Sequence, residues 1–309
     1  MISIQQIQYI LQLAETKSFS KAAEDCFVTQ PTLSMQIKKA EQVLGFHIFD
    51  RNKNPLGITH LGQELIPIIR ETNHANNNVI QLSKKALGTY TEEFTIGIIP
   101  TISPYLIPML YKNWKKELTH TRLIIKENKT EDLLNLLENK KLDLAIIAGP
   151  ATDSKWKASK LYTEELLAYT QNRDTNIIKT SDLHTEKPWL LSQGNCLRSQ
   201  MMQFCKIDQS ASDDWNFEGG NLELLIKMVD LNGGYTLIPK QYIDFLPRVK
   251  GAFHTIKDAK TNTSPARTIV SIQSNRNTKS DSIEKIIDSI RFLFSTTSSK
   301  KNYSIINWK

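Results

Sequence analysis

Cysteine is scarce in this chain, whose 309 residues include only three. Three thiols cannot build the paired framework of a small disulfide-stabilised secreted protein. Long apolar runs are also missing, since no stretch approaches the ~18 consecutive apolar residues of a membrane-spanning helix. The first residues lack the charged segment and following apolar segment that mark an export signal. We therefore expect a cytoplasmic protein with no membrane partner.

Charge of one sign is in excess. Lys and Arg number 39 against 32 Asp and Glu, which gives a net charge of +7 and a pI near 9.1. A basic balance suits a polyanionic partner, although many globular proteins share it. Hydrophobic residues make up 40% and charged residues 23%, which excludes global disorder, and the length allows two or three domains.

The start of the chain predicts a group of short helices. Apolar residues recur at helical spacing in the first segment, at Ile4, Ile7, Ile10, Leu11 and Ala14. Ser18 suits the cap of a helix at 19–26, and Thr29 suits the cap of a second helix that has Pro31 near its start and ends at Gly45. Two short helices joined by a tight turn form a helix-turn-helix.

The motifs SFSKAA at 18–23, TQPTLSMQI at 29–37, LG at 44–45 and FDR at 49–51 resemble the N-terminal domain of LysR-type transcriptional regulators in order and spacing. The resemblance implies a winged helix-turn-helix at 1–60 that binds double-stranded promoter DNA. It implies phosphate contacts for Lys21, Lys38 and Arg51 and base-edge contacts for Gln30 and Thr32. The full set of implied DNA-binding residues is Lys21, Thr29, Gln30, Pro31, Thr32, Ser34, Met35, Lys38, Arg51, Lys53 and Thr59. Cys26 is expected to be a packed thiol beside the domain core.

Residues 61–90 predict a linker and dimerisation helix. Steps of three and four residues alternate along Leu65, Ile68, Thr72, Ala75, Val79, Leu82 and Ala86, which is a heptad seam. Such a helix needs a partner, and the same helix of a second subunit would place two recognition helices on one duplex. Pro67 should kink the helix unless it lies close to the helix start, and 88–92 reads as a hinge.

Residues 91–309 alternate strands and helices, which favours an α/β fold with a mostly parallel sheet. Strands are expected at 94–100, 122–126, 142–147, 166–170, 189–191 and 268–273, and helices at 105–118, 131–138, 222–231 and 283–294. The arrangement resembles the periplasmic-binding-protein-like effector region of LysR-type regulators. That resemblance implies two α/β subdomains: lobe I at about 91–161 and 268–300, and lobe II at about 162–267.

Two of the three cysteines, Cys196 and Cys205, stand nine positions apart in one segment. Asn195 is a good helix cap, so the simplest structure puts Cys196 in the first turn of a helix and Cys205 near its end. The two sulfurs would then lie roughly 14 Å apart along the axis, on opposite faces. A disulfide between them would require the segment to unwind. The helix N-terminus and Arg198 would favour the thiolate form of Cys196, which is the form that peroxide oxidises. The alternative is that both cysteines are small buried residues that take no part in redox chemistry.

The pattern G-x-C-L-R-x-Q-x-x-x-F-C at 194–205 resembles the redox segment of the hydrogen-peroxide-sensing members of the LysR family. Further similar motifs are GIIPT at 97–101, PYL at 104–106, KLD at 141–143, NLE at 221–223, TLIP at 236–239 and RTI at 267–269. The resemblance implies that peroxide oxidises Cys196 and that Cys205 completes a reversible disulfide. It implies a peroxide pocket formed by Thr101, Thr130, Gly194, Asn195 and Arg267. Thr130 could instead be a helix cap, and Arg267 could instead form an ion pair between the lobes.

Two residues depart from the family pattern. Asn195 stands where histidine is common and Ser199 where aspartate is common, so the sensing reaction is expected to survive with an altered rate or pH dependence. The segment 296–309 has no motif, and we expect a poorly ordered or oligomer-contacting extension.

The sequence therefore predicts an oxidative-stress transcription activator that senses hydrogen peroxide, with no enzyme activity, cofactor or metal. By the resemblance, its partners are a second and further copies in a homodimer or homotetramer, RNA polymerase, and a cellular thiol that reduces the disulfide. The alternative is a LysR-type regulator that responds to a small effector in the cleft between the lobes, with passive cysteines. A thiol peroxidase would not need the DNA-binding region, and a transport binding protein is excluded by that region and by the missing export signal.

Overall fold

The computed structural model describes residues 1–53, 55–87, 91–149, 155–171, 175–207, 221–275, 280–295 and 303–307. The chain divides into two compact units, residues 1–92 and 93–309. None of the helices in the described ranges combines the length and apolar character needed to cross a membrane.

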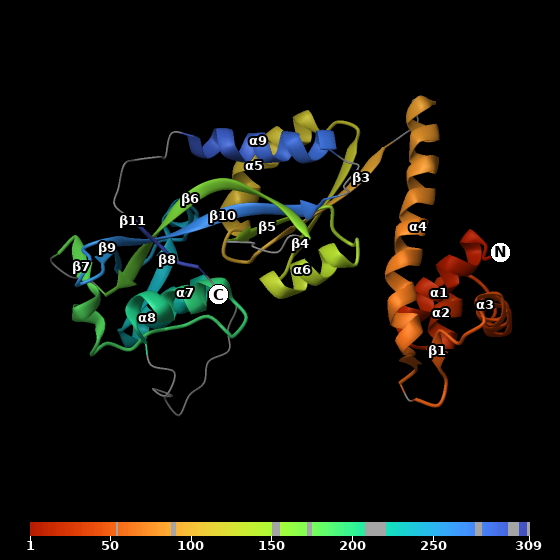
Figure 1. Ribbon diagram of the computed structural model, residues 1–309. Helices are drawn as coiled ribbons and strands as arrows, with labels where there is room; N and C mark the ends of the chain where they lie inside the picture. The colour runs from red at the N-terminus through yellow and green to blue at the C-terminus, as the bar shows by residue number, and fades with distance from the viewer. Residues whose placement is uncertain are drawn as a thin grey trace. The chain divides into compact units, whose positions relative to one another are not determined.

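The first unit is the predicted winged helix-turn-helix (Figure 1). Its elements are α1 (Ile4–Thr16), α2 (Phe19–Asp25), α3 (Gln30–Leu44), β1 (Phe49–Asp50), β2 (Gly57–Ile58) and α4 (His60–Ala86). Side chains of Ser18 and Thr29 accept backbone hydrogen bonds at the starts of α2 and α3, and Gly45 ends α3 with a φ of 79°. These local signals explain why the boundaries of both helices were predictable.

The long helix α4 buries only its first part in this unit. Ile66 and Ile69 belong to the same hydrophobic core as α1 to α3. On another face of the helix, apolar residues of the heptad seam are exposed: Ile68, Val79 and Leu82 have 62%, 70% and 70% of their surfaces open. Pro67 lies within the helix, which continues past it. From Ile68 to Leu82 the seam is therefore a surface that this unit itself does not cover.

The second unit is built on one continuous sheet with the strand order β4-β3-β5-β10-β6-β9-β7, to which β11 adds beside β10 and β8 beside β6. The bounds of its elements are β3 Glu92–Ile98, α5 Ser103–Glu117, β4 Thr121–Glu127, α6 Thr130–Glu138, β5 Leu144–Ala148, β6 Trp156–Thr170, β7 Ile177–Lys179, α7 Cys196–Cys205, α8 Leu222–Asn232, β8 Tyr235–Pro239, β9 Ala252–Lys257, β10 Ser264–Ser274, α9 Ser280–Phe294 and β11 Tyr303–Ile305. Two 3₁₀ helices cover Thr180–Leu183 and Lys240–Phe245.

The expectation of a mostly parallel sheet is wrong. β3 pairs with β5 in parallel, but β10 pairs antiparallel with both β5 and β6, and β6 pairs antiparallel with β8 and β9. The cause is the 15-residue strand β6, of which only the last five residues were predicted. Because β6 pairs with β10 over Trp156–Glu165 and with β8 and β9 over Leu166–Thr170, this one strand holds the two ends of the unit together.

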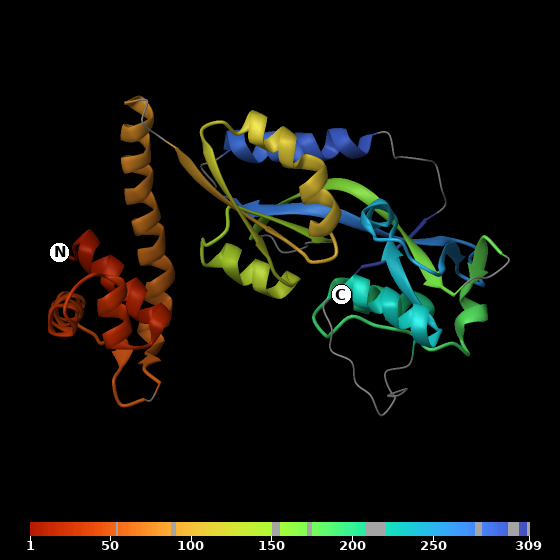
Figure 2. The same cartoon turned by 180° about the vertical axis from the view of Figure 1, so that it is seen from behind.

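We name the two ends of this unit by their elements. Lobe I contains β3, α5, β4, α6, β5 and α9, and lobe II contains β7, α7, α8, β8 and β9; β6 and β10 pass through both. In both views α5 and α9 cover one face of the lobe I strands and α6 covers the other (Figures 1 and 2). The β6–β10 register shifts between Ile269 and Val270, opposite Leu161. Such a bulge bends a strand and increases its twist, and here it falls where β10 also pairs with the end of β5.

Two further segments differ from expectation. The strand predicted at 189–191 is absent, and the chain there makes an isolated bridge between Pro188 and Tyr235 instead. The described part of the tail is ordered, because β11 pairs in parallel with β10 and Ile306 is 3% exposed. Residues 303–307 are therefore not the poorly ordered extension that was one of the two expectations, and the other, an oligomer contact, stays a prediction. Residues 296–302 and 308–309 lie outside the described residues.

Candidate functional site

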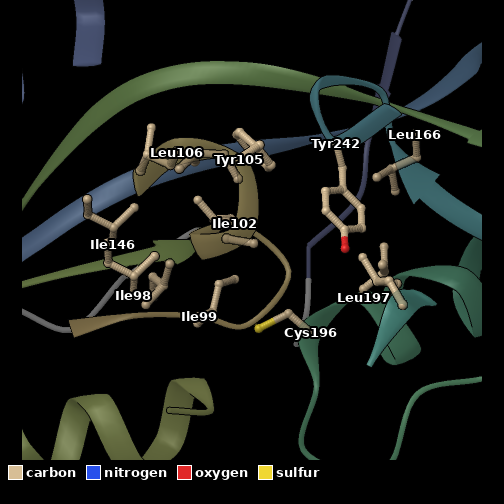
Figure 3. Close-up of a cluster of buried hydrophobic side chains, with 14 of the residues drawn as sticks. Ile98, Ile99, Ile102, Tyr105, Leu106, Ile146, Leu166, Cys196, Leu197 and Tyr242 are labelled. Atoms are coloured by element: carbon tan, nitrogen blue, oxygen red, sulfur yellow. The ribbon is translucent and has the colours of Figure 1, made fainter. Parts of the chain in front are cut away.

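The reactive-cysteine candidate stands where the two lobes of the second unit meet. Cys196 is the first residue of α7, as predicted, and is 5% exposed. Its sulfur points toward the lobe I segment that carries Ile99 and Ile102 (Figure 3). Across this junction the Thr130 Oγ1 lies 2.7 Å from the Cys196 Sγ. A thiol and a hydroxyl from different lobes are thus in direct contact.

Thr130 is not the helix cap that spacing alone allowed. Lys129 is the cap residue of α6, without a side-chain capping bond, and Thr130 is the first helical residue. Its side chain is 1% exposed. The Thr130 hydroxyl is therefore free to contact Cys196, and the family resemblance implied this location for Thr130.

Arg267 provides the positive charge of the site. Its guanidinium is fully buried, donates from Nε to Glu164 Oε2 at 2.5 Å, and donates from Nη1 to Thr101 Oγ1 at 2.9 Å. Nη2 also donates to the Thr101 carbonyl oxygen at 3.2 Å. Arg267 thus forms its ion pair with Glu164, its register partner on the neighbouring strand β6, rather than between the lobes, and it also fixes Thr101.

Sequence reasoning missed three members of this buried network. Glu164, on β6, is fully buried and accepts a hydrogen bond from the Tyr105 hydroxyl at 2.6 Å. The Tyr105 hydroxyl oxygen lies 2.5 Å from that of Tyr162. Burial raises the pKa of the Glu164 carboxyl, while Arg267 and Tyr105 oppose that rise. The residues are 57–59 positions apart, and a local motif could not have revealed them.

Burial opposes the local effects that were expected to favour the Cys196 thiolate. Burial raises the pKa of the Cys196 thiol above its ordinary value, and the Thr130 hydrogen bond and the charge of Arg267 oppose only part of that rise. Arg198 was expected to help, but its Nη1 donates to the Leu191 carbonyl oxygen at 2.9 Å. Desolvation favours the neutral form of an acid, so the protonated thiol predominates near neutral pH.

The loop before α7 is shaped by a different set of contacts. Asn195 is buried and its Nδ2 donates to the Ser192 carbonyl oxygen at 2.9 Å, so its side chain does not cap α7. Gly194 is exposed and has a φ of 86°, which favours glycine. Lys129 Nζ donates to the Gln193 carbonyl oxygen at 2.8 Å and thereby links α6 to this loop.

Cys205 ends α7 and is 4% exposed. Burial raises the pKa of its thiol to about 12, although a hydrogen bond with Tyr235 lowers it in part. Cys26, Cys196 and Cys205 are all free thiols. Ten helical residues separate the ends of α7 by roughly 14 Å, so the two sulfurs cannot bond without unwinding of the helix.

The implied DNA-binding residues form a second group, in the first unit. Lys21, Gln30, Met35 and Lys38 are exposed on α2 and α3, as are Thr29 and Pro31 at the start of α3, whereas Thr32 and Ser34 are partly buried there. Arg51 and Lys53 are exposed beside the two-stranded wing. Thr59 donates to the His47 carbonyl oxygen at 2.7 Å and accepts from the Gly62 amide, so it holds the wing to α4.

Glu41 organises the wing and was not predicted. This carboxylate is 3% exposed and accepts from the Ile48 amide at 2.8 Å and from Arg51 Nη2 at 3.3 Å. Arg51 also lies over the Phe19 ring, with its Cζ 5.4 Å from the ring centroid. Cys26 packs against the core of this unit, as expected, and burial raises the pKa of its thiol.

Comparisons with known proteins agree with this architecture. Residues 4–63 match the bacterial regulatory helix-turn-helix of the LysR family, and residues 88–277 match the LysR substrate binding domain. A hydrogen peroxide-inducible genes activator of Pectobacterium carotovorum is 32% identical over 242 residues, covering 77% of this chain and 80% of that protein. The transcriptional regulator EstR of Acinetobacter baylyi is 30% identical over 241 residues, with 77% and 80% covered. The structure of a full-length OxyR variant from Pseudomonas aeruginosa aligns with a TM-score of 0.74 and 26% identity, over 94% of this chain and 95% of that one.

A winged helix-turn-helix followed by a two-lobed α/β region defines a DNA-binding transcription regulator rather than an enzyme. The chain belongs to the LysR family, and its similarity extends to OxyR proteins.

Proposed function

We propose that this regulator senses hydrogen peroxide through a reversible Cys196–Cys205 disulfide. The observation that carries the proposal is the contact of the Cys196 sulfur with Thr130, in the field of the buried Arg267. The second thiol stands at the other end of the same helix. Relatives named as hydrogen peroxide-inducible genes activators support it as well.

The chemistry proceeds in two balanced steps. The Cys196 sulfur attacks one peroxide oxygen, and the other oxygen leaves and takes a proton, which yields sulfenic acid and water. The Thr130 hydroxyl can donate a hydrogen bond to the leaving oxygen, and Thr101 and Arg267 can stabilise its developing charge. The Cys205 sulfur then attacks the sulfenic sulfur, and a second water leaves as the disulfide forms. A cellular thiol restores both cysteines by exchange.

Unwinding of α7 converts this reaction into a structural change. A disulfide needs Cα atoms within about 7 Å, which α7 cannot offer while helical. We propose that the refolded segment alters packing between subunits and thereby the spacing of paired helix-turn-helix units on promoter DNA. The exposed seam of α4 supports a homodimer, and a homotetramer and contact with RNA polymerase follow from the family resemblance.

Mass analysis of the reduced chain after brief treatment with micromolar peroxide tests the proposal. We expect a Cys196–Cys205 disulfide in the unmodified chain and trapped sulfenic acid at Cys196 in the Cys205→Ser variant. The Cys26→Ser variant is the matched control and should behave like the unmodified chain. Reaction at Cys196 no faster than that of a free cysteine would contradict the proposal.

The second candidate is a regulator that binds a small effector, with passive thiols. The burial of both thiols favours it. DNA binding that ignores peroxide but shifts with an added small molecule would identify this function.

The DNA-binding proposal predicts two different mutational effects on α3. Lys38→Ala should weaken binding to all duplexes and reduce the salt dependence by about one released ion, because a lysine contact to phosphate reads no sequence. Gln30→Ala should relax the choice of base at one position, at a cost of about 1–3 kcal/mol. Titration of duplexes at several salt concentrations, and selection from a randomised pool, measure the two effects.

Lys116→Ala is the matched control for the lysine, because Lys116 is an exposed residue of α5 in the other unit. Equal salt slopes for Lys38→Ala, Lys116→Ala and the unmodified chain would argue against a phosphate contact at Lys38.

A further inference from the structure

The tail contributes a strand to the second unit. Tyr303 to Ile305 pair in parallel with Ser264 to Ala266 of β10. The Ile306 amide then donates to the Ala266 carbonyl oxygen at 2.8 Å, and the Ile306 side chain joins the hydrophobic core at 3% exposure. The tail is thus anchored by both its backbone and an apolar side chain.

This anchored tail touches the cysteine helix. Gln200 lies inside α7, is fully buried, and donates from Nε2 to the Ile306 carbonyl oxygen at 3.1 Å. Gln200 Oε1 accepts no hydrogen bond from the described residues. The Ile306 backbone therefore takes part in two hydrogen bonds, one to α7 and one to β10.

The position of Gln200 relates this contact to the reaction. Gln200 lies between Cys196 and Cys205, so it belongs to the segment that must unwind when the disulfide forms. The other end of the contact lies beside Arg267, which follows Ala266 on β10. A single tail segment thereby connects the helix that carries the thiol to the strand that carries the buried charge.

We propose that residues 303–306, which we call the C-terminal clip, hold α7 in the helical form that seats Cys196 against Thr130, and that Gln200 is the positioning residue through which they act. This inference rests on the proposed peroxide function. Disulfide formation must break the Gln200–Ile306 hydrogen bond, so the clip opposes that step while it favours the preceding oxidation of Cys196. Release of the clip is then part of the switch.

Two variants and one matched control separate this role from general stability. Gln200→Leu removes the hydrogen bond, and a chain that ends at residue 302 removes the clip. Gln203→Leu is the control, because Gln203 is an exposed residue of the same helix. Hydrogen exchange of α7 amides in the reduced protein should accelerate roughly fivefold in Gln200→Leu, the factor expected for one hydrogen bond, and no less in the shortened chain. Amides of β3 should keep their protection and report intact folding.

The redox readouts should move in opposite directions. Trapped sulfenic acid should form more slowly at Cys196 in the Cys205→Ser background, whereas the disulfide should follow the sulfenic acid faster when Cys205 is present. Gln200→Leu should add nothing in the shortened chain, because both changes remove the same contact. Loss of stability alone would not slow one step and speed the other.

Several outcomes would overturn the inference. They are α7 exchange equal to that of Gln203→Leu, additive effects of the two changes, or loss of β3 protection together with α7 protection. The exchange measurement needs no peroxide, so it distinguishes the two proposals. If exchange accelerates but peroxide does not react, the peroxide-sensing proposal fails while the stabilisation of α7 by the clip stands. If peroxide chemistry is normal but exchange is unchanged, the clip proposal fails.

Discussion

Arg267→Met is expected to lower the free energy of unfolding of the second unit by about 3–5 kcal/mol. The reason is that Glu164 would remain as a buried carboxylate without its cation, since both side chains are fully buried and joined at 2.5 Å. Thr101 would also lose two hydrogen bonds. All five tryptophans lie in this unit, so tryptophan fluorescence during urea titration follows its unfolding.

Two further variants test the cause. Arg122→Met removes an arginine of the same unit that is exposed and pairs with Glu93 at 3.7 Å, so its effect should stay below about 1 kcal/mol. Arg267→Met combined with Glu164→Leu should recover much of the loss, because no uncompensated charge is left buried. A double variant as unstable as the sum of the two single changes would contradict this account.

The elements that could be predicted are those with local signals. The ends of α2 and α3 are set by residues that lie close to them in the sequence: the caps Ser18 and Thr29, Pro31 near a helix start, and Gly45 at a helix end. The helix from Cys196 to Cys205 was predicted from similar reasoning, and its bounds are confirmed. The capping role predicted for the Asn195 side chain is not confirmed, because its amide donates to the Ser192 carbonyl oxygen instead.

The features that could not be predicted depend on contacts between distant residues. The Thr130–Cys196 contact spans 66 positions, and the Arg267–Glu164 pair spans 103. The antiparallel course of β6 beside β10 likewise follows from pairing of remote segments. The tail strand β11 was also missed, because three residues are too few to show a hydrophobic periodicity.

The protonation state of Cys196 illustrates a conflict between a local and a global effect. A helix N-terminus lowers the pKa of a cysteine, and this local effect was visible in the sequence. Burial has the opposite sign and is the larger cause here. Its extent depends on the lobe I segment that covers the thiol (Figure 3).

Oxidation of Cys196 is expected to become about tenfold faster for each pH unit from pH 6 to pH 8, because the thiolate fraction grows by that factor well below the pKa. Burial raises the pKa of Cys196, so the thiol form predominates over this range and the rate does not level off at neutral pH. Rates of sulfenic acid trapping in a Cys205→Ser, Cys26→Ser variant measure the profile for Cys196 alone.

The groups that face the Cys196 thiol determine in which direction each control variant should shift the dependence of the rate on pH. Thr130 and Arg267 both lower the pKa of Cys196, whereas the charge of Glu131 raises it. Thr130→Val should therefore move the rate profile to higher pH, and Glu131→Gln should move it to lower pH. A rate that stays constant from pH 6 to pH 8 would mean that the thiolate already predominates, and the burial of Cys196 would then not control its reactivity.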